Sequence, residues 1–211
     1  MTPQNDLDAL CSSFCSRVDR LRFVYATRPR LSTAELDRTT AFCTIELANA
    51  WTQFARAYYL SCTKGARTRA GARVTHNNVF RTYDDAVLYS VKAFKKTFKG
   101  VPTRRDEPDW SNPSTLLKLA DGLAFSNKKQ INTAFGVTTK IFSPLVTCRN
   151  FFAHRGQNTA DKIEKLSRSL AFIPPPRRAT VLLNSALPGK SRTVFEDWSS
   201  ALGIIGSALA A

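Results

Sequence analysis

The residues best suited to chemistry lie in one short stretch, CRNFFAHRG, at residues 148–156. An Arg is followed directly by an Asn, and a His stands five residues after the Arg. The imidazole of His154 can take a proton from a ribose 2′-hydroxyl or give one to a leaving 5′-oxygen. The guanidinium of Arg149 offers a rigid fork of donors that matches phosphate oxygens, and Asn150 can orient either His154 or the phosphate. These residue types are suited to chemistry at a phosphodiester.

The same stretch also permits a purely structural interpretation. It ends an apolar segment that we predict to be a helix from Thr138 or Thr139, with Gly156 as a left-handed C-terminal cap. The helix dipole favours an Arg and a His at this end, and Asn150 can satisfy end carbonyls without any catalysis. On these residues alone we would prefer the structural interpretation.

Helical geometry limits how the three side chains can meet. On an ideal helix of about 100° per residue, Arg149 and His154 lie about 140° apart, whereas Asn150 and His154, at i and i+4, share a face. One regular helix therefore cannot bring all three together. Either the helix loosens at His154, or a second copy of the chain completes the site.

The stretch resembles the Rx4–6H motif of the HEPN superfamily, in which a polar residue often follows the Arg and a basic residue often follows the His. The start of a predicted helix some forty residues upstream, WSNP at residues 110–113, is similar to HEPN proteins of toxin–antitoxin and phage-defence loci. The resemblance implies a homodimer in which two motifs line one cleft. Arg149, Asn150 and His154 would then be the catalytic residues.

For function, the resemblance implies a metal-independent endoribonuclease that cuts RNA by attack of the 2′-hydroxyl and leaves a cyclic phosphate. Bacterial relatives of this kind are usually toxins or defence effectors, so an antitoxin or defence-system partner is expected. The alternative is a HEPN-fold protein that binds RNA, a nucleotide or a partner without cutting. A third interpretation, a basic DNA-binding helical protein, is weakened because no clear helix-turn-helix signal is present.

Two further residues are candidates for supporting roles. Glu46, Asn49 and Gln53 form a polar stripe at i, i+3 and i+7 on an otherwise apolar helix. HEPN members often carry a polar or acidic residue on an early helix that faces the motif, and Glu46 is the candidate, although a structural hydrogen bond is its simpler role. Arg155, directly after His154, is a candidate phosphate contact.

The chain is strongly basic, with 31 Lys and Arg against 16 Asp and Glu, a net charge of +15 and an isoelectric point near 10.1. Such a charge attracts polyanions, and we expect RNA as the partner. The basic loop at 64–73, the basic face of the helix at 84–98, the loop at 99–111 and a Lys pair supply the candidate RNA contacts. They are Arg67, Arg69, Arg73, Lys95, Lys96, Arg104, Arg105, Lys128 and Lys129. A solvated surface charge is the alternative for each.

Other features set the compartment and exclude some classes of protein. The five cysteines are odd in number and scattered through helical segments, which favours free thiols in a reducing cytosol. No CxxC is present and there are only two histidines, so neither a metal nor a cofactor is expected. The N-terminus lacks signal-peptide features, and the most apolar segment, 201–211, is about half the length of a membrane span. We therefore expect a cytoplasmic protein without a membrane partner.

The fold class follows from periodicity. Apolar residues recur at three- and four-residue spacing, and strand-like alternation is absent, which predicts an all-α protein. With the resemblance, this becomes a HEPN-like helical bundle with extra helices at the C-terminus. We predict a domain over 1–172 that includes the motif helix, and a C-terminal extension over 173–211 packed on it. The expected helices span about 5–26, 32–62, 84–98, 113–124, 127–136, 138–155, 159–172, 178–186 and 193–211.

Overall fold

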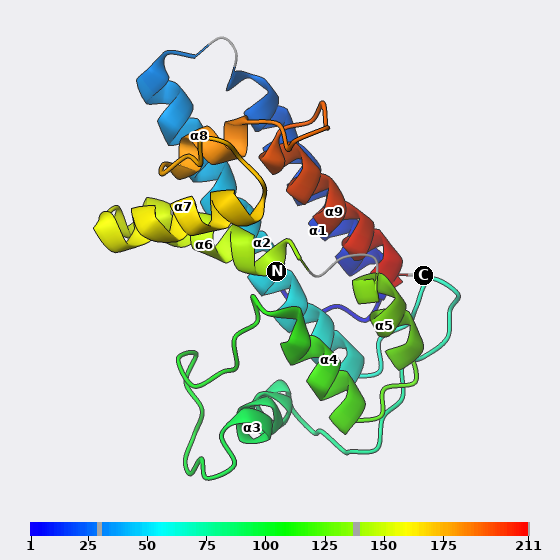
Figure 1. The fold of residues 1–211 in the computed structure, drawn as a ribbon. Helices are drawn as coiled ribbons and strands as arrows, with labels where there is room; N and C mark the ends of the chain where they lie inside the picture. The colour runs from blue at the N-terminus through cyan, green and yellow to red at the C-terminus, as the bar shows by residue number, and fades with distance from the viewer. Residues whose placement is uncertain (29–30, 137–139, 211) are drawn as a thin grey trace. The chain divides into compact units, whose positions relative to one another are not determined.

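The computed structural model describes residues 1–28, 31–136 and 140–210. Within these ranges the regular secondary structure is α-helix and no β-sheet forms, so the predicted all-α class is confirmed (Figure 1). The helices are α1 Leu7–Ala26, α2 Thr33–Thr63, α3 Tyr83–Phe94, α4 Pro113–Gly122, α5 Lys128–Gly136, α6 Phe142–His154, α7 Gln157–Ser169, α8 Ala179–Asn184 and α9 Val194–Ala210. None of the helices in these ranges is long and apolar enough to cross a membrane.

Helix α3 ends one turn earlier than predicted. A capping box between Thr82 and Asp85 fixes its start, but Lys95 leaves the helical region with φ −123° and ψ 78°. The amide of Phe98 then donates to the carbonyl of Lys95 at 2.9 Å, in a turn. Continuing the helix to Phe98 would place Lys92, Lys95 and Lys96 at i, i+3 and i+4 spacings, where like charges repel. The predicted end at Phe98 is therefore wrong, and repulsion among these lysines disfavours the longer helix.

The chain forms two compact units, each discontinuous in sequence. Unit 1 comprises Met1–Phe14, Trp51–Thr139 and Ile204–Ala211, and unit 2 comprises Cys15–Ala50 and Lys140–Gly203. Helices α1, α2 and α9 contribute residues to both units. The division into a domain over 1–172 and an extension over 173–211 stays a prediction.

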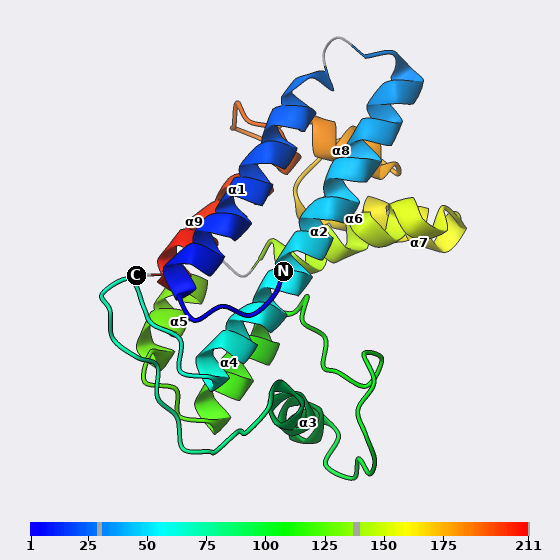
Figure 2. The same ribbon diagram turned by 180° about the vertical axis from the view of Figure 1, so that it is seen from behind.

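Unit 1 is built around an aromatic cluster. Phe14 stacks on Phe54 with ring centroids 4.3 Å apart, and Trp51 meets Phe135 edge to face at 5.9 Å. Helices α4 and α5, which follow one another in the chain, lie side by side (Figures 1 and 2). Local chemistry sets the start of α4, because the Asn112 side chain accepts the Ser114 amide at 3.0 Å and Pro113 occupies the first helical position.

A buried carboxylate orders the loop before α4. Glu107, whose side chain is only 4% exposed, accepts hydrogen bonds from Arg56 at 2.7 and 2.9 Å, from Trp110 at 2.8 Å and from Arg104 at 2.8 Å. Burial raises the pKa of Glu107, but the hydrogen bonds and the charge of Arg56 lower it by more, so the net pKa lies below its usual value. Glu107 is therefore ionised and holds the loop to α2.

Replacing Glu107 by Gln should lower the free energy of unfolding by about 2 kcal/mol, because the half-buried Arg56 loses the charge of its buried partner. Urea unfolding at pH 7 measures this loss. The matched control is Asp19→Asn at a carboxylate 67% exposed on α1, which should change stability by no more than about 0.5 kcal/mol. Equal stability of the two variants would show that the Glu107 cluster contributes nothing.

Unit 2 contains the motif helix. Tyr25 stacks on Phe195 with centroids 4.1 Å apart, its hydroxyl lies 2.9 Å from the Leu183 carbonyl, and burial raises its pKa to about 12. Helices α6 and α7 pack against one another, and both contact α8 (Figure 1). This packing buries one side of α6 and leaves its C-terminal end accessible.

Candidate functional site

Helix α6 presents the motif because its apolar residues recur on one face. Its buried side chains are Phe142, Leu145, Cys148, Phe151 and Phe152. The intervening residues Arg149 and Asn150 are half-buried, and His154 at the end of the helix is exposed. Burial raises the pKa of the Cys148 thiol, which is the inert state of a core cysteine. The predicted helix start at Thr138 or Thr139 lies outside the described residues.

The end of α6 differs from the prediction. Arg155 leaves the helix with φ −28° and ψ 91°, and Gly156 is extended, with φ −150° and ψ 171°. Gly156 thus caps the start of α7, and its amide donates to the Thr159 hydroxyl at 3.0 Å. The predicted left-handed C-terminal cap is wrong, because α7 begins directly after the turn. Glycine suits the close approach, since a Cβ atom there would lie 3.3 Å from the His154 carbonyl oxygen.

The three motif side chains do not converge within one chain. The helix continues through His154, so Arg149 and His154 remain on sides of α6 about 140° apart. The Nη1 of Arg149 donates to Oδ1 of Asn150 at 3.0 Å, so Asn150 orients Arg149 rather than His154. His154 makes no hydrogen bond or ion pair with any residue that the structure describes. The motif thus consists of a hydrogen-bonded pair, Arg149 and Asn150, and a separate, exposed imidazole, that of His154.

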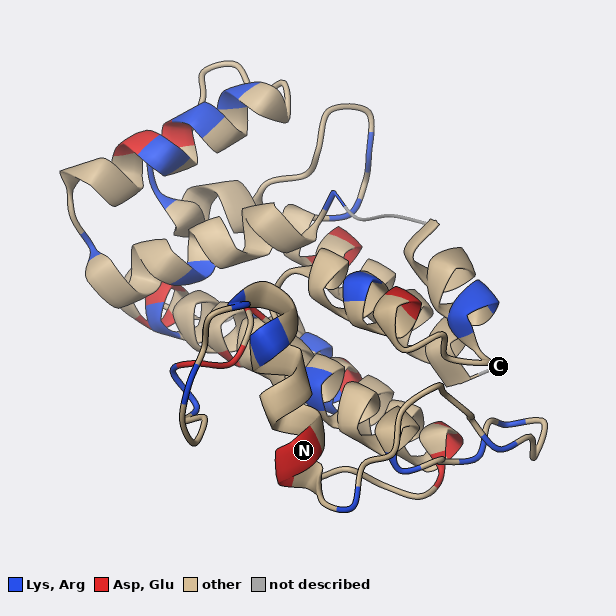
Figure 3. Cartoon of the chain, turned by 90° about the horizontal axis from the view of Figure 1, so that it is seen from below, with Lys and Arg blue, Asp and Glu red and all other residues tan. Residues whose placement is uncertain are grey.

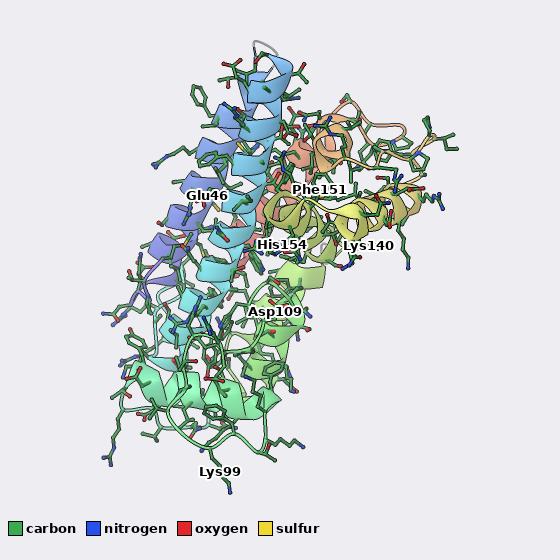
Figure 4. All side chains as sticks on the ribbon, turned by 90° about the vertical axis from the view of Figure 1, so that its left-hand side faces the viewer. Glu46, Lys99, Asp109, Lys140, Phe151 and His154 are labelled. Atoms are coloured by element: carbon green, nitrogen blue, oxygen red, sulfur yellow. The ribbon has the colours of Figure 1, made fainter. Side chains whose placement is uncertain are left out.

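Glu46 forms an ion pair with Arg17 rather than a contact with the motif residues. Its carboxylate accepts from Nη2 of Arg17 on α1 at 2.7 Å and from Nδ2 of Asn49 at 3.3 Å. Both charged side chains are about a third exposed, at 32% and 31%. Figure 4 shows Glu46 on α2 and His154 on α6. The structure thus gives Glu46 the structural hydrogen bonds that were the simpler expectation, and it adds Arg17, which sequence reasoning missed.

Arg155 is held by Asp37. This carboxylate, 14% exposed, accepts from Arg155 at 2.9 Å and Arg178 at 3.5 Å, and also from the Thr180 hydroxyl. Burial raises the pKa of Asp37, but the Thr180 hydrogen bond and the charges of the two arginines lower it by more, leaving it below its usual value. Arg155 therefore fixes the turn between α6 and α7 to α2, which positions the end of the helix that carries His154.

Replacing Asp37 by Asn should lower stability by about 1–2 kcal/mol at pH 7, because two arginines and a hydroxyl lose a charged acceptor. The folded-state pKa of Asp37 is depressed, so this contribution is complete above the unfolded-state pKa of about 3.9 and is lost as pH falls through the lower folded value. The unfolding free energies of wild type and Asp37→Asn, measured from pH 7 to pH 3, should become more similar as the pH approaches 3. Asp19→Asn, at a carboxylate 67% exposed, is the control and should show no such difference. A constant difference across this range would contradict the assignment.

Next to the motif, α7 carries cations that sequence reasoning missed. Lys162 and Lys165 are exposed, and neither forms an ion pair with a residue in the described ranges. Arg168 and Arg177, in contrast, both pair with Glu164. The amphipathic pattern of α7 was readable from sequence, but which of its charges are neutralised depends on tertiary contacts. Lys162 and Lys165 are thus positive charges available to a polyanion on the helix that packs against α6.

The predicted RNA contacts all belong to unit 1, and several are neutralised. Arg69 pairs with Asp8 at 2.6 Å, Lys95 with Asp106 at 3.4 Å, and Arg104 with Glu107. Lys128 pairs with Asp121. Figure 3 shows Lys and Arg distributed over helices and loops, with acidic residues among them.

The remaining predicted contacts are not neutralised by a carboxylate in the described ranges. Lys96, Arg105 and Lys129 are exposed and form no ion pair within the described ranges. Arg67 and Arg73 donate only to backbone carbonyls, those of Gly71 at 3.5 Å and Gly65 at 3.0 Å. The basic loop that contains them is ordered, with a turn closed by Thr68 and Ala72 at 2.8 Å. These five residues are the predicted contacts that remain open to an anion.

The fold and motif together define an all-helical protein with an Arg–Asn pair and an exposed His at the end of one helix. Comparison with known proteins finds no matching protein family, no similar curated protein and no similar solved structure. Among the residues that the structure describes, no three or more His, Cys, Asp or Glu side chains are grouped as a metal site would require.

Proposed function

We propose that the protein is a metal-independent endoribonuclease of the HEPN type that acts as a homodimer. The observation that carries the proposal is the state of Arg149. Its guanidinium is held by Asn150 at 3.0 Å, yet no carboxylate in the described ranges neutralises it. Arg17, Arg28 and Arg56, by comparison, each pair with a glutamate within 3.1 Å. An oriented and unneutralised guanidinium suits a phosphate oxygen.

The structural interpretation of the motif predicts bonds that are not found. If Arg149, Asn150 and His154 served only to end α6, their side chains should donate to its terminal carbonyls. In the described ranges Arg149 donates to a side chain, and neither Asn150 nor His154 donates to such a carbonyl. The hydrogen-bonded cap therefore loses its basis and only the helix dipole remains for the structural interpretation, which favours the catalytic role.

Helical geometry supports the dimer that the HEPN resemblance implies. Arg149 and His154 lie on different sides of α6, so in the proposed site a second copy of the chain supplies the groups that one copy lacks. In such a dimer one His154 would accept the proton of the 2′-hydroxyl as its oxygen attacks the phosphorus. The other would protonate the departing 5′-oxygen, and Arg149 would stabilise the pentacoordinate phosphorane. The products are a 2′,3′-cyclic phosphate and a 5′-hydroxyl.

The cellular role is proposed with the activity. A cytoplasmic HEPN ribonuclease would act as a toxin or defence effector, with an antitoxin or other defence-system protein as its partner. Its substrate would be single-stranded or loop RNA, because the 2′-hydroxyl must reach an in-line geometry that a regular A-form helix resists. The open cations of α7 would add to the electrostatic attraction of the RNA.

Product chemistry tests the proposal. The purified protein should cleave total RNA in the presence of EDTA, and the fragments should carry 2′,3′-cyclic phosphate and 5′-hydroxyl ends. In light scattering the active species should have twice the mass of the 23.5 kDa chain. Fragments with 3′-hydroxyl ends, or activity only with added Mg²⁺, would contradict the mechanism.

Substrate preference is tested by competition. RNA and duplex DNA are offered together over a salt series, since phosphate-driven binding weakens with salt for both. We expect RNA to be preferred at every salt concentration. A preference for duplex DNA would favour the DNA-binding alternative instead.

A further inference from the structure

Unit 1 contains a second candidate site, independent of the proposed ribonuclease motif. An open cavity of about 720 Å³ lies between the basic loop, the start of α5 and the last turns of α9. Its volume is within the range of small-ligand sites. The lining residues that carry the argument are Thr68, Arg73, Asn127, Lys129, Gln130 and Thr133. None of the described lining residues is acidic.

Two positively charged side chains line the cavity, and neither is paired with a carboxylate in the described ranges. Lys129 forms no ion pair with any described residue, and Arg73 uses only its Nε, which donates to the Gly65 carbonyl at 3.0 Å. The two terminal nitrogens of Arg73 are therefore open. Arg73 and Lys129 come from the loop and from α5, so a ligand in the cavity would meet one cation from each.

The start of α5 adds backbone donors. The amide of Lys128 bonds the Phe125 carbonyl and that of Ile131 bonds the Asn127 carbonyl, both at 3.1 Å or less. Lys129 and Gln130 lie between these two residues in the chain, and their amides have no acceptor within the part of the chain described. Free amides in the first turn of a helix, together with the helix dipole, favour an anion such as phosphate.

Asn127 gives an independent sign of a ligand, because it is 93% buried and one of its polar atoms has no partner. The Tyr58 hydroxyl donates to the Leu209 carbonyl at 3.1 Å, so it must accept from Asn127, which places Nδ2 of Asn127 on Tyr58 at 2.9 Å. This arrangement leaves Oδ1 of Asn127 as the acceptor without a donor. Buried acceptors are nearly always hydrogen-bonded, so a bound N–H or O–H group is expected near Asn127.

We propose that this cavity binds a phosphomonoester whose organic part carries a hydrogen-bond donor, as a nucleotide does. Arg73, Lys129 and the first amides of α5 receive the phosphate, and Asn127 accepts from the base or sugar. Two sources share this chemistry, a free mononucleotide and the 5′-phosphorylated end of an oligonucleotide. The proposal does not depend on catalysis at His154.

Calorimetric titration of the full-length protein tests the site with four probes. They are AMP, adenosine, and a DNA dinucleotide with either a 5′-phosphate or a 5′-hydroxyl; DNA is used because it lacks the 2′-hydroxyl that cleavage needs. We expect AMP or the phosphorylated dinucleotide to bind at least about tenfold more tightly than its unphosphorylated counterpart. Tighter binding of AMP identifies a free nucleotide, and tighter binding of the phosphorylated dinucleotide identifies a chain end. Equal affinities with and without phosphate would overturn the proposal.

Matched variants locate the binding. Lys129→Glu should lower the affinity for the preferred phosphorylated probe by about tenfold or more, and Arg73→Gln should lower this affinity to a similar extent. Lys99→Glu, at an exposed lysine that does not line the cavity, makes the same charge change and should leave affinity within about twofold. Equal weakening by Lys129→Glu and Lys99→Glu would show that net charge rather than this cavity binds the ligand, which would contradict the proposal.

Discussion

Replacing His154 by alanine is expected to reduce RNA cleavage in EDTA by about 10³-fold, because both proton-transfer groups of the dimer are lost together. The fold should be unaffected. His154 is exposed and makes no hydrogen bond or ion pair in the described ranges, so the free energy of unfolding should change by no more than about 0.5 kcal/mol. Initial cleavage rates and thermal melts of the same preparations separate the two effects.

The other histidine of the chain is the matched control. His76 lies in unit 1, where its Nε2 is 2.9 Å from the Thr63 carbonyl and its ring centroid is 5.3 Å from that of Phe80. Replacing His76 by alanine should therefore lower stability and leave the cleavage rate of the folded protein unchanged. Equal cleavage by wild type and His154→Ala would remove the catalytic role of His154. RNA binding without cleavage by either protein would instead favour a HEPN-fold binding protein.

Most helix boundaries were predictable because short-range chemistry sets them. Asn112 and Thr82 start α4 and α3 through bonds to amides two or three residues away, and these signals are present in the sequence. The wrong end of α3 and the wrong cap at Gly156 depended on competing interactions, and α7 also begins and ends earlier than the predicted 159–172, at Gln157 and Ser169. The end of α3 reflects repulsion between lysines, and the turn at Gly156 reflects the immediate start of α7.

The residues of the candidate site could be predicted from the sequence, but whether their charges are neutralised could not. The residue types and spacing of Arg149, Asn150 and His154 are visible in the sequence, as is the angle between them. Which cations remain open is not visible, because ion pairs join residues that are far apart in the chain. Asp37 neutralises Arg155 and Asp8 neutralises Arg69, whereas Arg149 is left open. Only tertiary structure distinguishes these arginines, and the proposed function depends on that distinction.

Replacing Arg149 by lysine is expected to lower the cleavage rate by about 10²-fold, with a smaller effect on RNA affinity. Lysine keeps the positive charge, so long-range attraction of RNA is retained. It lacks the planar fork, however, and its shorter reach to Asn150 removes the bond at 3.0 Å that orients the guanidinium. Single-turnover cleavage and RNA binding, measured on the same variant, should therefore diverge.

Arg155→Lys makes the same chemical change six residues further along the chain, just after α6 ends. Arg155 is already paired with Asp37 at 2.9 Å, and a lysine ammonium can keep that ion pair, so the cleavage rate should stay within about threefold of wild type. If both substitutions had the same effect, the guanidinium of Arg149 would have no special role. If Arg149→Lys weakened RNA binding and cleavage equally, Arg149 would contribute ground-state binding rather than transition-state stabilisation. The difference between these two lysine variants is thus the most direct measure of whether an unneutralised, Asn-oriented arginine on α6 acts on phosphate during cleavage.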